Sequence, residues 1–80
     1  MLDLGQAKNV TNIGLSHLKS LTNLRALDLT AAKITDAGLV HLEGLKKLER
    51  LDLSLTAITP AGVRQLRRAL PGCDINEPVP

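Results

Sequence analysis

The stretch Leu48–Ile58, LERLDLSLTAI, places leucine at positions 48, 51 and 53 and isoleucine at position 58. Leu51 and Leu53 alternate with Asp52, which is the period of a strand with one buried face. The same spacing occurs 24 residues earlier, where Leu24–Ile34 reads LRALDLTAAKI. A single segment of this kind cannot bury its apolar side alone. The repetition therefore predicts stacked turns that share one continuous core.

The 24-residue period continues outside these two segments. It includes glycines at positions 14, 38 and 62 and leucines at positions 18, 42 and 66. Leucines three residues apart favour short helices with one buried stripe, and a threonine suited to N-capping precedes each of them at positions 11, 35 and 59. We predict helices over 12–19, 36–43 and 60–69, with Pro60 at the first helical position. Because glycine is unfavourable inside a helix, the repeated glycines indicate close packing between neighbouring turns.

The first and last turns depart from this period. Leu4 to Val10 is one residue longer than the equivalent step later in the chain, which predicts a small loop or bulge around Ala7–Asn9. At the other end, LPGCDI (residues 70–75) fits the leucine spacing if Cys73 and Ile75 take the leucine positions. This alignment predicts a shortened last turn and a buried, structural Cys73 thiol. We therefore expect one repeat domain over residues 1–75 and an extended tail over 76–80.

Composition narrows the classes of function. The 80-residue chain contains no Phe, Trp or Tyr and has a net charge of +2. Binding of single-stranded nucleic acid usually requires aromatic rings for base stacking, so nucleic acid is not an expected partner. The single cysteine excludes an internal disulfide, no apolar run has membrane-spanning length, and the N-terminus does not read as a signal peptide. We expect a cytoplasmic protein that has no membrane partner.

The segment LTNLRALDLTAAKITDAGLVHLEGLKKLERLDLSLTAITPAGV (residues 21–63) closely resembles the bacterial leucine-rich-repeat family of 24-residue repeats. It is also similar to the F-box-associated and ribonuclease-inhibitor-like groups, which share the helix start Ile-Thr-Asp-x-Gly-Leu. The resemblance covers Leu2 to Ile75 and implies an α/β fold, namely a right-handed leucine-rich-repeat solenoid. About three βα repeats plus a terminal strand would form a parallel sheet on the concave side and short helices on the convex side. The closing LPGCDI looks like the C-terminal end of such an array.

Strand alternation points to one candidate site. Asp28, Asp52 and Asp74 are expected to face the concave side in one row, joined by Asp3 if the first strand is in register. Parallel strands lie about 4.8 Å apart, so such neighbours should raise each other's pKa values. The row has three interpretations: solvated strand residues, a weak protein-recognition surface, or a metal site. The candidate binding residues are Asp28, Thr30, Arg50, Asp52, Ser54 and Asp74.

Other polar residues are weaker candidates for a functional site. His17 and His41 lie one period apart and make an incomplete metal site on the outer helices. A basic outer surface is expected from Lys46, Lys47, Arg64, Arg67 and Arg68. No triad, nucleophile elbow, phosphate loop or zinc-protease motif occurs. We therefore expect no enzyme activity, no cofactor and no resident metal.

The predicted function is protein–protein interaction through the concave sheet. Four short strands present a face of only roughly 200 Å², whereas a specific interface buries about 800 Å² per partner. Such a face needs flanking surface or further repeats for tight binding. Two alternatives stay open. One is a purely structural terminal segment of a larger or self-associated array, and the other is a substrate-adaptor fragment in protein turnover.

The sequence also predicts how two copies of the chain would associate. The strand Leu2–Leu4 lies at the N-terminal edge, where its outer backbone groups would lack partners. Exposed strand edges favour pairing with another chain. The sequence thus predicts a homodimer that joins two N-terminal edges with two-fold symmetry.

Overall fold

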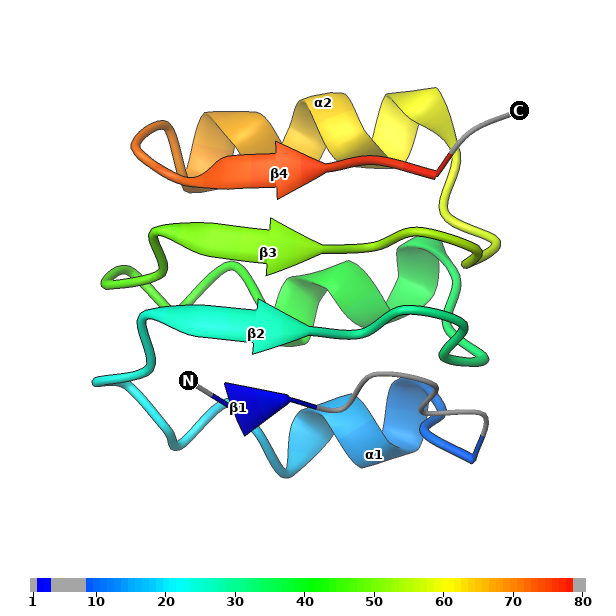
Figure 1. The fold of residues 1–80 in the computed structure, drawn as a ribbon, viewed down its shortest axis with the longest axis horizontal. Helices are drawn as coiled ribbons and strands as arrows, with labels where there is room; N and C mark the ends of the chain where they lie inside the picture. Colours follow the sequence, from blue (N-terminus) through cyan, green and yellow to red (C-terminus); the bar gives the residue numbers. More distant parts are fainter. Residues whose placement is uncertain (1, 4–8, 79–80) are drawn as a thin grey trace.

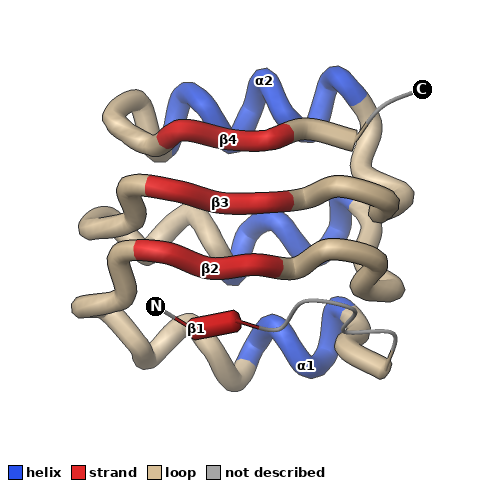
Figure 2. Tube along the Cα trace, viewed as in Figure 1, coloured by secondary structure: helices blue, strands red, loops and turns tan. Residues whose placement is uncertain are grey.

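A parallel sheet forms one side of the molecule in the computed structural model, which describes residues 2–3 and 9–78. Its four strands are β1 (Leu2–Asp3), β2 (Ala26–Asp28), β3 (Arg50–Asp52) and β4 (Asp74–Asn76). They lie side by side in chain order (Figure 2). The register places Leu27 opposite Leu51, and Leu51 opposite Ile75. The strand positions thus repeat every 24 residues from β2 to β4.

Three helical segments lie behind the sheet. They are α1 (Asn12–Ser16), the 3-10 helix η1 (Asp36–His41) and α2 (Pro60–Ala69). In Figure 1 each strand runs left to right in front, and the chain returns behind it while rising from β1 to β4. This path is a right-handed coil with the sheet on one side and the helices on the other. The predicted α/β solenoid is confirmed.

The helical segments comprise two α-helices and one 3-10 helix, and leucine spacing is consistent with the 3-10 helix of the second turn. In the second turn Leu39, Leu42, Leu45 and Leu48 are three residues apart, and each N–H from Leu42 onward donates to the carbonyl three residues back at 2.9–3.0 Å. A spacing of three matches the 3-10 helix, which has three residues per turn, better than the α-helix with 3.6. The prediction of a helix over 36–43 thus becomes a 3-10 helix that ends at His41.

The first and third turns both form α-helices. Leucines 15, 18, 21 and 24 are also three residues apart, and α1 ends at Ser16 instead of residue 19. In the third turn the buried residues Val63, Leu66 and Leu70 have the three–four spacing of an α-helix. There α2 covers Pro60–Ala69 as predicted, with Pro60 in its first turn. The spacing of buried residues therefore agrees with the helix type in the second and third turns, whereas α1 is an α-helix although its leucines are three residues apart.

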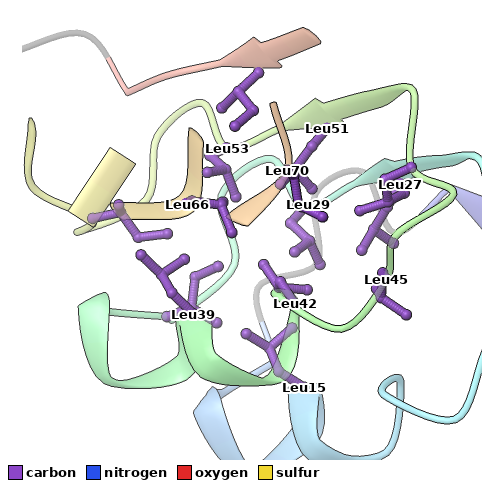
Figure 3. Close-up of a cluster of buried hydrophobic side chains, with 14 of the residues drawn as sticks. Leu15, Leu27, Leu29, Leu39, Leu42, Leu45, Leu51, Leu53, Leu66 and Leu70 are labelled. Carbon is purple, nitrogen blue, oxygen red and sulfur yellow. The ribbon is translucent and has the colours of Figure 1, made fainter. Parts of the chain in front are cut away.

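The core lies between the sheet and the helices and consists of aliphatic side chains. Figure 3 shows leucines from all three helical segments and from the strands meeting there. Leu51 of β3 is 1% exposed, and no polar or charged side chain of the described residues is buried. Identical leucines stacked in register can fill this space without aromatic rings because each turn repeats the same shape.

The C-terminal end of the repeats differs from the expectations, whereas most of the predicted N-terminal bulge lies outside the described residues. Asn9 is the one described residue of the predicted bulge at Ala7–Asn9, and the rest of it lies outside the described residues. The expected shortening of the last turn is wrong, because Ile75 pairs with Leu51 at the full 24-residue step. Leu70 fills the core at the end of α2, and Cys73 is half-buried instead of taking a core position. Strand β4 also extends to Asn76, one residue beyond the expected end of the repeat domain.

Candidate binding face

The side of the sheet away from the helices carries the candidate site. Residues 27, 51 and 75 point into the core, so their neighbours along each strand face solvent. We call the outward set the sheet face: Ala26, Asp28, Arg50, Asp52, Asp74 and Asn76. These residues line a shallow hollow of about 290 Å³. No described helix covers this side (Figure 1).

The register arranges the sheet face in two rows. One row is Asp28, Asp52 and Asn76, and the other is Ala26, Arg50 and Asp74. The backbone of Asp3 pairs with that of Asp28. The predicted row that includes Asp74 is therefore wrong: Asp74 lies on the same face but stands opposite Arg50. The physical reason is that β4 pairs through Ile75, which moves Asp74 to the other outward position of its strand.

Asp28 and Asp52 each bond to the residue two positions later. Asp28 Oδ1 accepts from the Thr30 N–H at 2.9 Å and from the Thr30 hydroxyl at 2.6 Å. Asp52 Oδ1 accepts from the Ser54 N–H at 2.9 Å. A carboxylate that accepts from the backbone two residues on forms a local turn. Thr30 and Ser54 thus hold the two aspartates at the ends of their strands.

The pKa of Asp52 is lowered, whereas the sequence led us to expect an increase. Burial raises the pKa of Asp52, but donors from Ser54, Asn76 and Thr30 together outweigh burial and lower the pKa below 3.8. The Asn76 amide also donates to the Ser54 hydroxyl at 3.2 Å. The expected increase in pKa is therefore wrong for Asp52, because hydrogen bonds stabilise its charged form.

Because the folded pKa of Asp52 is lowered, its ionised form stabilises the fold above pH 3.8, and this stability is lost as the pH falls through the folded value. We expect Asp52→Asn to lower the free energy of unfolding at pH 7 by less than about 1 kcal/mol, since water screens this half-exposed carboxylate. Urea unfolding at pH 7 and pH 2 measures the difference. The control Asp74→Asn removes a charge from the same face. A cost for Asp52→Asn that is equal at both pH values would contradict the assignment.

The turns that follow β2 and β3 hold two unusual backbones. Ala31 and Leu55 have φ angles of 66° and 61°, in the left-handed region that residues other than glycine rarely adopt. Leu55 is also 78% exposed. A large apolar side chain therefore stands in solvent one residue after Ser54 and three residues after Asp52. The sequence pattern alone did not indicate this feature.

The other polar candidates lie away from the sheet face. His17 is exposed and His41 half-exposed, and in the described part of the chain no three His, Cys, Asp or Glu side chains gather as a metal site would require. The basic residues on α2, Arg64, Arg67 and Arg68, are exposed. Lys46 donates to the Ala69 carbonyl at the end of α2 at 2.9 Å. None of the described helices is long and apolar enough to span a membrane.

Two polar clamps join neighbouring turns on the helix side, and sequence reasoning missed both. The Thr35 N–H donates to Asn12 Oδ1 at 3.0 Å, and Asn12 Nδ2 donates to the Thr35 hydroxyl at 2.9 Å. In the next turn, the Thr59 N–H donates to Asp36 Oδ1 at 2.9 Å, and the Thr59 hydroxyl donates to Asp36 Oδ2. The Thr35 hydroxyl accepts from Asn12 and makes no cap bond to η1, whereas the Thr59 hydroxyl donates to Asp36 and accepts from the Gly62 N–H, so it caps α2. The sequence does contain one sign of these clamps, because Asn12 and Asp36 lie one 24-residue period apart.

Glycine makes room for these clamps. A Cβ atom added to Gly38 would overlap Asn12 Oδ1, and one added to Gly62 would overlap Asp36 Oδ1. A leucine of the preceding turn also comes within 3.0 Å of each added Cβ. The predicted close packing between turns is therefore confirmed at these two glycines.

A family model described as leucine-rich repeat matches residues 20–42 and residues 44–66. These segments cover more than half of the chain and include η1, β3 and the start of α2. A search of curated proteins finds no match.

Proposed function

This chain belongs to the leucine-rich repeat family, and on that premise we propose that it is a protein-binding module that contacts its partner through the sheet face. Repeats of this family generally serve as protein-interaction modules. The observation that carries the proposal is the hollow of about 290 Å³, lined by outward side chains of β2, β3 and β4 and open to solvent.

The chemistry of the sheet face suits recognition by hydrogen bonds and charge. Arg50 and Asp74 stand opposite each other, yet neither side chain has a hydrogen bond or ion pair with another described residue. Both remain available to a partner. Asp28 and Asp52 are held in place by their own turns, so they lose little conformational entropy when they bind. Leu55, three residues after Asp52, adds an exposed apolar side chain.

The size of the face limits the kind of partner. The two inter-strand steps between β2 and β4, about 4.8 Å each, span roughly 10 Å, which is the length of about three residues of an extended chain. A folded partner would bury far more surface than this at a specific interface. A short extended segment therefore fits better than a flat protein surface, and we expect weak affinity unless surfaces beside the sheet also contribute.

The proposal is tested by selecting peptides that bind the 80-residue chain from a random displayed library. Each selected peptide is then measured against two charge-reversal variants by fluorescence anisotropy. Arg50→Glu changes the sheet face, whereas Arg64→Glu makes the same change on exposed α2. We expect Arg50→Glu to weaken binding at least tenfold and Arg64→Glu to have little effect.

Asp74→Lys supplies a second charge reversal on the sheet face, of opposite sign, and helps to identify the charge of the bound segment. Peptides that respond to Arg64→Glu and not to either sheet-face variant would contradict the proposal. Failure to select any peptide that depends on the sheet face would instead support the alternative that the chain is a purely structural segment.

A further inference from the structure

The β-turn that follows β3 contains a leucine in a backbone conformation that disfavours it. The Thr56 N–H donates to the Leu53 carbonyl at 3.3 Å, which closes a four-residue turn with Leu55 in the third position. Leu55 has a φ of 61° there. A turn with a positive φ at its third residue favours glycine or asparagine, because other side chains are strained in this conformation. The backbone of this turn therefore does not explain why the residue is leucine.

Packing in the core does not explain the leucine either. Leu55 is 78% exposed, so its side chain removes little apolar surface from water when the chain folds. Three other large apolar side chains of the described residues are exposed, and none of them has a positive φ: Ile13, Leu21 and Val40. In the described part of the chain, Leu55 thus combines exposure of a large apolar side chain with a strained backbone.

The preceding turn of the coil has the same backbone without the large side chain. The Ala32 N–H donates to the Leu29 carbonyl at 3.0 Å, and Ala31 takes the third position with a φ of 66°. Ala31 and Leu55 lie one 24-residue period apart. The repeat accounts for the positive φ at both positions. It does not account for the leucine, which occurs at one of them.

Hydrogen bonds fix the backbone next to Leu55. The Ser54 carbonyl accepts from the Ala31 N–H at 2.9 Å, and the Ser54 N–H donates to Asp52 Oδ1 at 2.9 Å. The Ser54 hydroxyl accepts from the Asn76 amide at 3.2 Å. Because this backbone is already held in place, a partner that contacts Leu55 would have to order little more than the leucine side chain.

We propose that Leu55 determines the specificity of the binding module, by contacting an apolar side chain of the extended segment that binds the sheet face. This inference rests on the function proposed above. Three residues of chain reach at most about 11 Å, which limits the distance between the Cα atoms of Asp52 and Leu55. An extended segment of three or four residues has about this length, so one segment can contact both residues. A strained backbone that packing does not require is typical of binding sites.

The test compares substitutions that separate the side chain of Leu55 from its backbone strain. Leu55→Gly removes both, so it should raise the urea midpoint of unfolding and weaken the selected peptides at least fivefold in fluorescence anisotropy. Leu55→Ala removes the side chain but keeps a Cβ atom at the positive φ. It should weaken binding to a similar degree and leave the midpoint nearly unchanged. Ala31→Gly relieves the same strain one turn earlier, so it should raise the midpoint without weakening binding.

A peptide substitution tests the contact itself. We expect the selected peptides to share an apolar residue at one position. Replacing that residue by alanine should weaken binding to the native chain at least fivefold and have little further effect on binding to the Leu55→Gly variant. Val40→Ala is the matched control, because it truncates an exposed apolar side chain of η1 on the helix side. It should leave binding unchanged.

The sheet-face variant Arg50→Glu separates this inference from the function on which it rests. Peptides that Arg50→Glu weakens and both Leu55 variants do not would overturn the role of Leu55 and leave the sheet face as a binding site. Peptides that respond to neither change, or a selection that yields none, would contradict both proposals. An unchanged midpoint for Leu55→Gly would contradict the strain. Dimers of the 80-residue chain that Leu55→Gly disperses in sedimentation would also overturn the inference, because the occupant would then be a second copy.

Discussion

Replacing Leu51 by alanine is expected to lower the free energy of unfolding by about 2–5 kcal/mol, the usual cost of truncating a buried leucine. Leu51 is 1% exposed and lies at the centre of the core, paired in register with Leu27 and Ile75. Since domains of this kind are stable by only about 5–15 kcal/mol, much of the total would be lost. Urea unfolding followed by circular dichroism measures the change.

The chain offers a matched control for this substitution. Leu55→Ala removes the same atoms from a side chain that is 78% exposed. We expect that change to stay within about 0.5 kcal/mol, as is usual for surface substitutions. A cost below about 1 kcal/mol at Leu51, or equal costs at the two leucines, would show that the assigned strand register is incorrect.

Gly62→Ala is expected to cost about 1–3 kcal/mol, the typical range for an added group in a tightly packed place. Alanine is the better helix former, so propensity alone predicts a gain. The sign reverses because the new Cβ would overlap the Asp36 carboxylate that clamps Thr59, and it would also approach Leu39 Cδ1 to 3.0 Å. Thermal and urea unfolding both report this loss.

A double-mutant cycle assigns the cause. Asp36→Ala removes the clamp and the overlapping oxygen together, so Gly62→Ala should cost less in that background than in the native chain. The remaining cost would reflect Leu39. Gly44→Ala, where no atom lies within 4 Å of the new Cβ, should be neutral or stabilising. Additive effects of Gly62→Ala and Asp36→Ala would contradict the clamp as the source of the penalty.

The 24-residue period was sufficient to predict the architecture. Leucines at 48, 51 and 53 predict a strand buried on one face, and the repetition predicts parallel stacking in one coil. The bounds of α2 also follow from sequence, because Thr59 and Pro60 mark its start and Val63, Leu66 and Leu70 keep α-helical spacing. These features depend on local pattern and on a repeat that each turn can satisfy in the same way.

The candidate site was predicted less completely. Alternation along a strand places Asp28, Arg50 and Asp52 on the outer face without further information. It does not decide which residues become neighbours across strands. The step from Leu48 to Leu70 suggested one alignment, whereas β4 adopts another, with Ile75 opposite Leu51. The difference of two residues moved Asp74 from the aspartate row to a position opposite Arg50.

The sequence by itself determined the fold and the face on which each strand residue lies. Only the tertiary structure decided the register of β4, the lowered pKa of Asp52 and the clamps between turns. The physical reason is the distance along the chain over which each feature is determined. Periodicity acts within one turn, whereas the clamps and the contributions of Asn76 and Thr30 to the Asp52 pKa come from residues 22–24 positions away, which approach only after the turns have stacked.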